Sequence, residues 1–318
     1  MICAGCGEPT GQRPCTGCQA DPWVRDTYRL DSVLGRGATG TTYAGTRTSD
    51  GSRFALKEIR APANPKAAEL VAREPAVLAK LRHPQLPLFE EAFRIGSGKQ
   101  AAFWIVQSLV EGETLHDEVA RGPLSEADAL TVVADLLPVL EYLHSRQPPV
   151  IHRDIKPRNV MRARDGRLVL LDLGSARDAL VDPDFGGSTV AGTFGYMAPE
   201  QFRGDASPAS DIYGLGALLV YLLCKREPSS LADHAGRLRW ERAVQPSARI
   251  ETLLTGMLAP DPGVRFAGVA AVQRALVAEI LPPPPVGTGP RAEPQSWRTA
   301  AFLFAGVIFT VFLIAAFR

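Results

Sequence analysis

The sequence predicts an α+β protein whose long central segment begins with strands and continues with helices. Residues 28–60 contain three strand-like apolar runs that are separated by turn residues. Residues 125–146 begin with Ser125, a plausible helix N-cap, which is followed by acidic residues in the first turn. From that point on, the segment has mainly helical patterning.

Local features support this order of elements. The Ser49-Asp50-Gly51 cluster lies between two strand-like runs and predicts a hairpin turn. Residues 66–82 have helical spacing, but Pro75 lies inside that pattern. Because proline lacks a backbone donor, we expect Pro75 to kink the helix or to end its first part.

Composition excludes several classes of protein. The chain has 318 residues, of which 46% are hydrophobic and 22% are charged, as in an ordinary folded protein. These values exclude a disordered or collagen-like chain. The net charge is +1, from 35 basic and 34 acidic residues. Such a balance provides no general basic field, so we expect no nucleic-acid partner.

Four of the five cysteines lie in residues 1–20. Cys3 and Cys6 form one C-x-x-C pair, Cys15 and Cys18 form another, and eight residues separate the pairs. Two such pairs suit a tetrahedral Zn²⁺ ion with four thiolate ligands, so we predict a zinc ribbon-like module with a structural zinc. Reactive thiols or disulfides are the alternative. Cys224 lies in an apolar run and is expected in the core.

The other end of the chain has a different character. Residues 282–297 form a Pro-rich linker, and residues 298–318 are predicted to form a transmembrane helix. The 19 residues from Thr299 to Phe317 carry no charge, which is enough to cross a hydrocarbon core about 30 Å thick. The alternatives are an amphipathic surface helix, for which the segment lacks a polar face, and a docked apolar helix.

A glycine cluster and a lysine suggest phosphate chemistry in the strand-rich part. Gly35, Gly37 and Gly40 form a G-x-G-x-x-G string between two strands, which suits a flap over phosphates better than a dinucleotide-binding turn. An ordinary hairpin is the alternative. Lys57 ends an apolar strand and needs an anion, which Glu74 or a phosphate would supply. A lysine that merely leaves a strand is the alternative.

A polar cluster next to apolar strands is the strongest local signal. Residues 151–159 read IHRDIKPRN, and residues 168–174 read LVLLDLG. Basic, acidic and amide side chains packed beside such apolar runs need a shared ligand or network to offset their desolvation. The side-chain oxygens of Asn159 and Asp172 are ligands that Mg²⁺ prefers.

These motifs, taken together and in order, resemble the eukaryotic-type (Hanks-type) serine/threonine protein kinase family. The matching residues are the glycine cluster, Lys57, Glu74, His152-Arg153-Asp154, Lys156, Asn159, Asp172, Gly174 and Ala198-Pro199-Glu200. The resemblance spans about residues 28–281. It implies the two-lobed kinase fold, with a β-rich N-lobe over residues 28–110 and a helical C-lobe over residues 111–281.

The resemblance also implies roles in phosphoryl transfer from ATP. Lys57 would hold the α- and β-phosphates and pair with Glu74. Asp172 and Asn159 would ligate Mg²⁺ or Mn²⁺. Asp154 would orient the substrate hydroxyl and accept its proton.

Further roles follow from the same resemblance. Lys156 would stabilise the transferring phosphoryl group, and Thr193 would contact Asp154 and Lys156. Glu200 and Arg265 would form a buried structural ion pair.

An adenine site is implied in the same way. The hinge would be Ser108-Leu109-Val110, and Leu34, Thr42, Ala55 and Met161 would form the apolar slot, although each of these four also fits plain core. The expected ATP-binding residues are Leu34, Gly35, Gly37, Gly40, Thr42, Ala55, Lys57, Ser108, Val110 and Met161.

Regulation and location complete the expectation. Ser188 and Thr189 are candidate phosphorylation sites that Arg153 would bind, unless they belong to an unmodified loop. We expect a bacterial serine/threonine kinase anchored in the cell (inner) membrane by its C-terminal helix, with its kinase domain in the cytoplasm. Its partners would be protein substrates and a second copy for autophosphorylation. The alternative is a catalytically silent ATP-binding scaffold that recruits partners through the zinc module.

Overall fold

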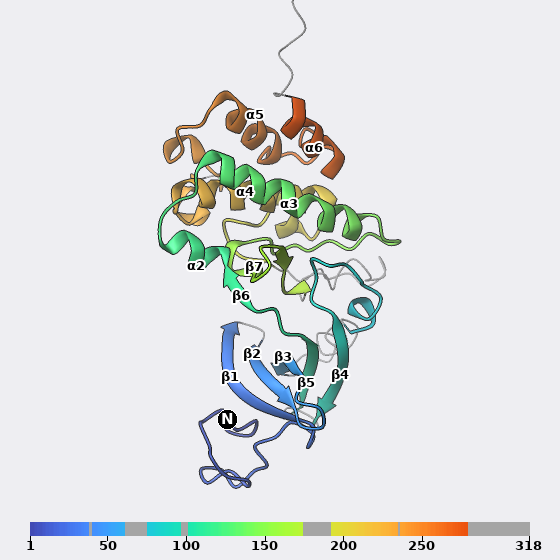
Figure 1. Ribbon diagram of the computed structural model, residues 1–318. Coiled ribbons are helices and arrows are strands. Elements are labelled where there is room, and N and C mark those ends of the chain that lie inside the picture. Colours follow the sequence, from blue (N-terminus) through green and yellow to red (C-terminus); the bar gives the residue numbers. More distant parts are fainter. Residues whose placement is uncertain (38–39, 61–74, 97–100, 174–191, 235, 279–318) are drawn as a thin grey trace, which may run out of the picture. The chain divides into compact units, whose positions relative to one another are not determined.

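The computed structural model describes residues 1–37, 40–60, 75–96, 101–173, 192–234 and 236–278. Residues 1–278 form one compact unit (Figure 1). Its strand-rich part precedes its helical part in the sequence, as predicted. The Glu74, Ser188 and Thr189 positions, Gly174 and the apolar tail lie outside the described residues.

The strand-rich part is a five-stranded antiparallel sheet with the order β1-β2-β3-β5-β4. Its strands are β1 (Tyr28–Gly37), β2 (Gly40–Arg47), β3 (Arg53–Arg60), β4 (Phe89–Ile95) and β5 (Ala102–Ser108). The predicted turn joins β2 to β3, where the Arg47 N–H donates to the Ser52 carbonyl at 2.8 Å. Gly51 has φ +74° in this turn, a conformation that glycine adopts without steric cost.

The helical part is built on two long helices. Helix α3 (Glu126–His144) begins at the predicted cap, where the Ser125 side chain accepts a hydrogen bond from the Asp128 N–H. Helix α4 (Pro208–Cys224) packs against α3 and is buried along most of its length. The remaining helices are α2 (Leu115–Ala120), α5 (Ala248–Met257) and α6 (Val269–Ala278). Cys224 is half-buried at the end of α4.

Short elements lie between the sheet and the long helices. A three-stranded sheet has the order β6-β7-β8, and a 3₁₀ turn, η2, leads directly into β7. These elements are β6 (Gly112–Thr114), η2 (Pro157–Asn159), β7 (Val160–Ala163) and β8 (Leu168–Leu170). The remaining 3₁₀ turns are η4 (Pro199–Arg203), η5 (Pro228–Leu231) and η6 (Trp240–Arg242).

The helix predicted over residues 66–82 is described only from Pro75 onward. Residues 75–78 are helical, and the Pro75 carbonyl accepts the Ala79 N–H at 2.8 Å. Leu78 and Leu81 from this segment are buried in the large core that extends through the helical part. Both leucines therefore face the core as their helical spacing predicts.

Residues 1–27 pack against the outer end of the five-stranded sheet. The Ile2 N–H donates to the Leu30 carbonyl of β1 at 2.7 Å, and Val24 bridges to Tyr28. Val24, Tyr28 and Leu30 are fully buried in a second apolar cluster, against which Ile2 is packed. The segment therefore shares its core with the sheet.

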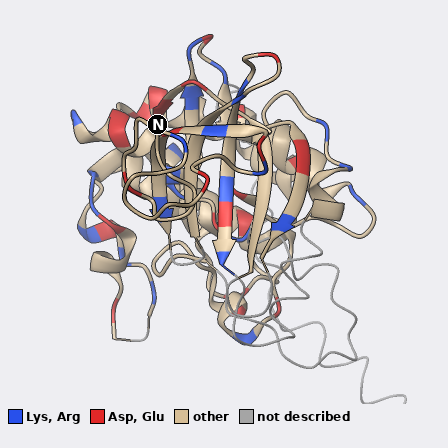
Figure 2. Cartoon of the chain, turned by 90° about the horizontal axis from the view of Figure 1, so that it is seen from below, with Lys and Arg blue, Asp and Glu red and all other residues tan. Residues whose placement is uncertain are grey.

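Charges of both signs are interspersed on the face shown in Figure 2. Arg25 pairs with Glu91 on β4 at 3.3 Å, and its guanidinium lies 4.5 Å from the centre of the Phe93 ring. This contact adds a polar link between residues 1–27 and the sheet.

Among the described residues, no helix has both the length and the apolar character needed to span a membrane.

Candidate active site

One buried carboxylate holds the loop over residues 151–159 in place. Asp211, in the first turn of α4, accepts backbone hydrogen bonds from His152 at 2.9 Å and from Arg153 at 2.8 Å. It also contacts the His144 Nε2 atom at 2.8 Å. Burial raises the pKa of Asp211, but its hydrogen bonds and the nearby imidazoles outweigh burial and hold that pKa below its usual range.

Two further contacts fix the direction of the loop. Arg153 has φ +69°, a left-handed conformation that costs energy for a side chain larger than glycine. The Gln201 side-chain amide donates to the Arg153 carbonyl at 2.9 Å and accepts the Ala198 N–H at 3.0 Å. The loop is therefore tied to both α4 and the Ala198-Pro199-Glu200 segment.

Asp154 lies at the centre of a set of converging donors. Its Oδ1 atom accepts a hydrogen bond from the Thr193 hydroxyl at 2.7 Å. Its Oδ2 atom accepts from Lys156 Nζ at 2.7 Å and from Asn159 Nδ2 at 2.9 Å. Lys156 also donates to the Thr193 hydroxyl at 2.6 Å. The Asp154 carboxylate is thereby held in one orientation, as a group that must meet a substrate hydroxyl requires.

Glycines allow the backbone to approach this centre closely. Gly192 precedes Thr193 and has φ +136°. A Cβ atom at Gly192 would lie 2.9 Å from the Arg153 carbonyl oxygen and 2.5 Å from Met197 Cγ. A larger residue at position 192 would therefore push the Thr193 hydroxyl away from Asp154.

An ion pair between Lys57 and Asp172 connects the five-stranded sheet to the segment after β8. Lys57 projects from β3, and its ammonium forms an ion pair with the Asp172 carboxylate just after β8. Asp172 has φ +59°, which turns the chain at the end of the apolar strand. Glu74, the partner expected for Lys57, lies outside the described residues.

Asn159 and Asp172 offer oxygen ligands for a divalent cation. The Asn159 Nδ2 atom donates to both the backbone carbonyl and the side chain of Asp154. Its Oδ1 atom has no hydrogen-bond partner among the described side chains and is free to act as a ligand. The Asn159 carbonyl accepts the Leu171 N–H at 2.7 Å, which fixes the residue just before Asp172. This donor set of amide and carboxylate oxygens fits Mg²⁺ or Mn²⁺.

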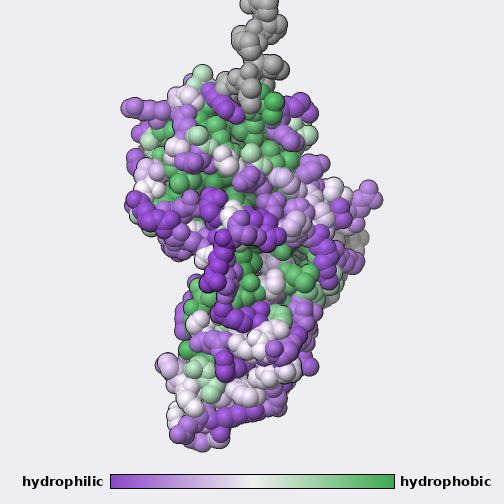
Figure 3. All heavy atoms as spheres, viewed as in Figure 1, coloured by the Kyte–Doolittle hydropathy of each residue, from purple (hydrophilic) through white to green (hydrophobic). Residues whose placement is uncertain are grey.

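Two of the residues expected at the ATP site, Ala55 and Lys57, share one face of β3. On β3, Ala55 and Lys57 alternate with Phe54 and Leu56, which are buried in the outer apolar cluster. Alternation along a strand therefore places Ala55 and Lys57 on the opposite face. Figure 3 shows hydrophobic surface in the recess between the sheet and the helical part.

The remaining adenine-site residues have contrasting environments. Leu34 is 52% exposed on β1, and Met161 is half-buried on β7. Thr42 pairs with Lys57 across β2 and β3. Ser108 exchanges hydrogen bonds with Leu88 through both its backbone N–H and its hydroxyl. Among the described residues, the backbone N–H and carbonyl of Val110 form no hydrogen bond with the backbone outside helices and strands.

Glu200 and Arg265 form the expected buried pair. Two N–H groups of Arg265 donate to the Glu200 carboxylate at 2.7 and 3.2 Å, and the Ser210 hydroxyl donates to it at 2.7 Å. Burial raises the pKa of Glu200, but the Arg265 and Ser210 hydrogen bonds outweigh it and lower that pKa. No described contact links this pair to Asp154. The pair joins η4 to the segment before α6, and Arg265 also donates to the Ala209 carbonyl of α4 at 2.7 Å.

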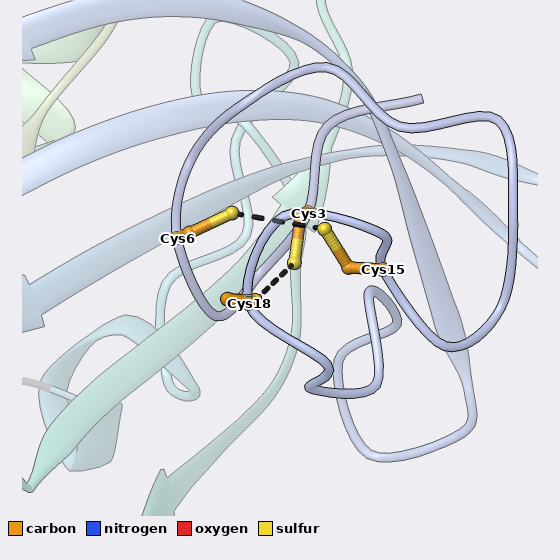
Figure 4. A group of neighbouring side chains, drawn as sticks. All are labelled: Cys3, Cys6, Cys15 and Cys18. Atoms are coloured by element: carbon orange, nitrogen blue, oxygen red, sulfur yellow. Dashed lines mark hydrogen bonds between the residues drawn. The ribbon is translucent and has the colours of Figure 1, made fainter.

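The four amino-terminal cysteines gather at one point, as Figure 4 shows. Their sulfur atoms all lie within 4.8 Å of one another. The Cys3 and Cys18 sulfurs are 3.6 Å apart, and those of Cys6 and Cys15 are 3.8 Å apart. Sulfurs at a tetrahedral Zn–S distance of about 2.3 Å would be separated by about 3.8 Å. The cluster therefore fits a zinc module.

The pKa values of two of these thiols also fit the binding of a cation. Backbone N–H groups of Cys18 and Gly17 lower the pKa of Cys15 to about 6, while burial raises the pKa of Cys3 to about 12. One thiolate is thus favoured by the protein itself, whereas the buried Cys3 thiolate needs a positive ion. Gly5 allows the close turn, since a Cβ atom there would lie 2.9 Å from Ala20 Cβ.

Comparison with known families identifies the domain. The family described as "protein kinase domain" matches residues 28–277, which is well over half of the chain. The chain belongs to the protein kinase family. The matched residues contain Lys57, Asp154, Asn159 and Asp172, whose geometry is given above.

Several curated proteins that are similar to this chain are protein kinases. The serine/threonine-protein kinase PknA of Nostoc sp. is 35% identical over 288 residues, covering 85% of this chain and 50% of that protein. The serine/threonine-protein kinase F of Synechocystis sp. is 33% identical over 283 residues, covering 82% and 57%. Calcium/calmodulin-dependent protein kinase type IV of Rattus norvegicus is 34% identical over 217 residues, covering 67% and 43%. The chain spans about half the length of these curated relatives.

Sequence reasoning missed most of what holds the catalytic loop. The stretch from Asp211 to Gly216 resembles the kinase family, but the contacts of Asp211 with the loop were not predicted, and His144 and Gln201 were given no role. Asp211 is the one acid in the otherwise apolar stretch of α4. A buried acid in such a helix requires partners, and that signal pointed to a network.

Proposed function

We propose that the chain transfers the γ-phosphoryl group of ATP to serine or threonine hydroxyls of proteins. The arrangement of Lys156, Thr193 and Asn159 around the Asp154 carboxylate is the observation that carries this proposal. Phosphoryl transfer needs positioning and charge neutralisation more than covalent catalysis, and this centre supplies both.

Each residue of the centre would have its own role in phosphoryl transfer. The Asp154 carboxylate would orient the attacking hydroxyl and accept its proton. Lys156 Nζ, 2.7 Å from Asp154 Oδ2, would neutralise charge on the transferring group. Lys57 would exchange its contact with Asp172 for the α- and β-phosphates. Asn159 and Asp172 would hold Mg²⁺ or Mn²⁺, which supplies charge neutralisation at the phosphates when bound.

A direct test compares the full-length chain with its Asp154→Asn variant. Asparagine keeps the size of the side chain but cannot accept the proton, so transfer from γ-labelled ATP should fall by a factor of about 10²–10⁴. Nucleotide binding, measured with a fluorescent ATP analogue, should persist in both proteins. Undiminished transfer in the variant would refute the proposed role of Asp154. A parent that binds nucleotide but transfers no label would favour the silent scaffold.

Regulation and anchoring are part of the same proposal. Ser188 and Thr189 would be autophosphorylated, with Arg153 as the partner of the new phosphate and a second copy as the acting kinase. The uncharged stretch from Thr299 to Phe317 would anchor the protein in the cell (inner) membrane, with the kinase domain in the cytoplasm. Phosphosite mapping of the labelled parent and membrane flotation of the full chain test these two points.

The cysteine cluster would hold one structural zinc ion. Its support is the tetrahedral spacing of the four sulfurs and the donor chemistry of thiolates. Four protein ligands leave no open coordination position, so the zinc would stabilise the fold of residues 1–27 rather than take part in the reaction. Metal analysis of the purified chain should give about one zinc ion per chain.

A further inference from the structure

One side chain of the catalytic loop is exposed while its neighbours are not. From Ile151 to Val160, every residue is buried or half-buried except Arg158. Arg158 lies in η2, two residues after Lys156 and directly before Asn159. Three residues separate it from Asp154, so the Cα atoms of the two residues lie at most about 14 Å apart. The backbone of Arg158 therefore lies close to the hydroxyl-binding centre.

A stacked pair of rings holds the Arg158 side chain. Arg158 Nη2 lies 2.7 Å from His116 Nε2 on α2. His116 Nδ1 lies 3.1 Å from the hydroxyl oxygen of Tyr221 on α4, and the two rings stack with an interplanar angle of 16°. Three separate elements thus build one polar cluster, and α2 packs directly on η2.

The direction of these hydrogen bonds follows from the arginine. A guanidinium can only donate, so His116 Nε2 must accept and the imidazole must be neutral. The His116 proton then lies on Nδ1 and is donated to the Tyr221 oxygen. The hydroxyl hydrogen of Tyr221 is left without an acceptor among the described residues. The cluster accordingly presents donors and no acceptor.

The positive charge of Arg158 has no counter-charge in this part of the structure. No carboxylate of the described residues forms an ion pair with it. The nearby acids of α2 are used elsewhere: Glu118 pairs with Arg162 at 3.0 Å, and Asp117 accepts the Thr114 hydroxyl at 2.6 Å. An oriented, exposed guanidinium beside a reaction centre is a ready site for a carboxylate or a phosphoryl group.

We propose that Arg158, positioned by His116 and Tyr221, selects protein substrates with an anionic side chain near the phosphorylated serine or threonine. The proposal rests on the kinase activity proposed above. An acidic residue and a previously phosphorylated residue offer the same oxygen chemistry. Both would receive hydrogen bonds from the guanidinium while the substrate hydroxyl lies at Asp154.

The test uses the full-length chain and degenerate peptides with a central serine or threonine. One position at a time, from four before to four after the acceptor, is fixed as glutamate, phosphoserine, glutamine or lysine. At one of these positions, kcat/KM should be about fivefold higher for the anionic residues than for glutamine. Comparing glutamate with phosphoserine distinguishes the two sources of the anion.

Charge reversal gives the decisive variant. Arg158→Glu should invert the preference at that position in favour of lysine, while peptides that are neutral there keep their kcat. Arg274→Glu makes the same charge change at an exposed residue of α6 and should leave the preference intact. Tyr221→Phe keeps the ring but removes the oxygen that His116 contacts. It should weaken the preference through KM rather than kcat, as expected for loss of a positioning residue.

The outcomes separate this inference from the kinase assignment. A parent that phosphorylates neutral peptides and shows no preference for anionic residues would overturn the anion subsite and leave the kinase activity intact. An unchanged preference in Arg158→Glu would overturn it as well. A parent that phosphorylates no peptide and not itself would instead refute the proposed function.

Discussion

The catalytic loop and the amino-terminal cysteine cluster each gather groups that are costly to hold together, and they are surrounded by very different amounts of protein. Asp211 is 1% exposed and lies under the catalytic loop within a core that extends across α3, α4 and α5. The cysteine cluster lies in a segment of 27 residues, and Cys6 and Cys18 are exposed. The first centre is held by the fold, whereas the second has the spacing of a metal site.

The two centres also differ in the source of the groups that offset the cost of holding charged side chains together. Around Asp154 and Asp211, the contacting groups come from the chain itself: backbone N–H groups, a side-chain amide, an ammonium group, a hydroxyl and an imidazole. Around the cysteines, the main chain favours one thiolate at Cys15, and burial disfavours another at Cys3. The segment shares its apolar core with the sheet, and the zinc ion proposed above would add to its stability.

The largest effect should come from breaking the buried pair inside the helical part. Glu200→Ala leaves the fully buried guanidinium of Arg265 without its counter-charge, so the free energy of unfolding should fall by about 3–5 kcal/mol. Denaturant unfolding of the full chain measures this loss. In the double variant Glu200→Ala/Arg265→Met both charges are gone, and much of the stability should return. Equal losses in the single and double variants would contradict an electrostatic origin.

A smaller effect is expected from emptying the cysteine cluster. Cys3→Ser/Cys6→Ser should lose the zinc ion and loosen the contacts of Ile2 and Val24 with the sheet. The thermal midpoint should fall by roughly 5–10 °C, since 1 kcal/mol corresponds to about 2–4 °C in a domain of this size. Cys224→Ser, at a half-buried thiol outside the cluster, is the matched control for zinc content. Zinc lost without any change in midpoint would show that the cluster folds independently of the sheet.

The smallest effect should appear in the acid dependence of stability. The pKa values of Asp211 and Glu200 lie below their ordinary values of 3.8 and 4.5 in the folded protein. Their contribution is therefore present above the unfolded-state pKa and is lost as pH falls through the folded-state pKa. As pH falls from about 5 to about 3, the free energy of unfolding should decrease less in Asp211→Asn than in the parent. The difference between the two decreases should be on the order of 1 kcal/mol.

The exposed Asp205 provides the control for this pH series. Its carboxylate is 73% exposed and lies 3.8 Å from Arg203 Nε. Asp205→Asn should follow the parent curve across the same range, because an exposed pair contributes little to stability. A parent curve that is flat below pH 5 would show that Asp211 and Glu200 are not stabilised as anions by the fold.

The sequence allowed some contacts within the candidate active site to be predicted, because kinase chemistry requires particular residue types at ordered positions. Asp154, Lys156 and Thr193 meet as the family resemblance implied. The hairpin at Gly51 and the helix start at Ser125 followed from local backbone chemistry. Such features depend on a few neighbouring residues and leave a clear pattern.

Contacts between distant segments that no family motif carries were beyond sequence reasoning. The Ile2 N–H and the Leu30 carbonyl belong to the backbone, which every residue shares, so no side chain announces their hydrogen bond. The contact of Lys57 with Asp172 depends on how the sheet approaches the loop after β8. The ring stack of His116 and Tyr221 joins residues 105 positions apart, and only the packing of α2 and α4 brings them together.

The bridge from Ile2 to Leu30 has one more consequence. β1 is the first strand of the five-stranded order and has β2 as its one neighbour within that sheet. A free strand edge is a template for pairing with another chain and so for aggregation. By donating to the Leu30 carbonyl, Ile2 occupies part of that edge. The cysteine segment thus shields the nucleotide-binding sheet from edge-to-edge association, a protection that a kinase domain trimmed to begin at Tyr28 would lose.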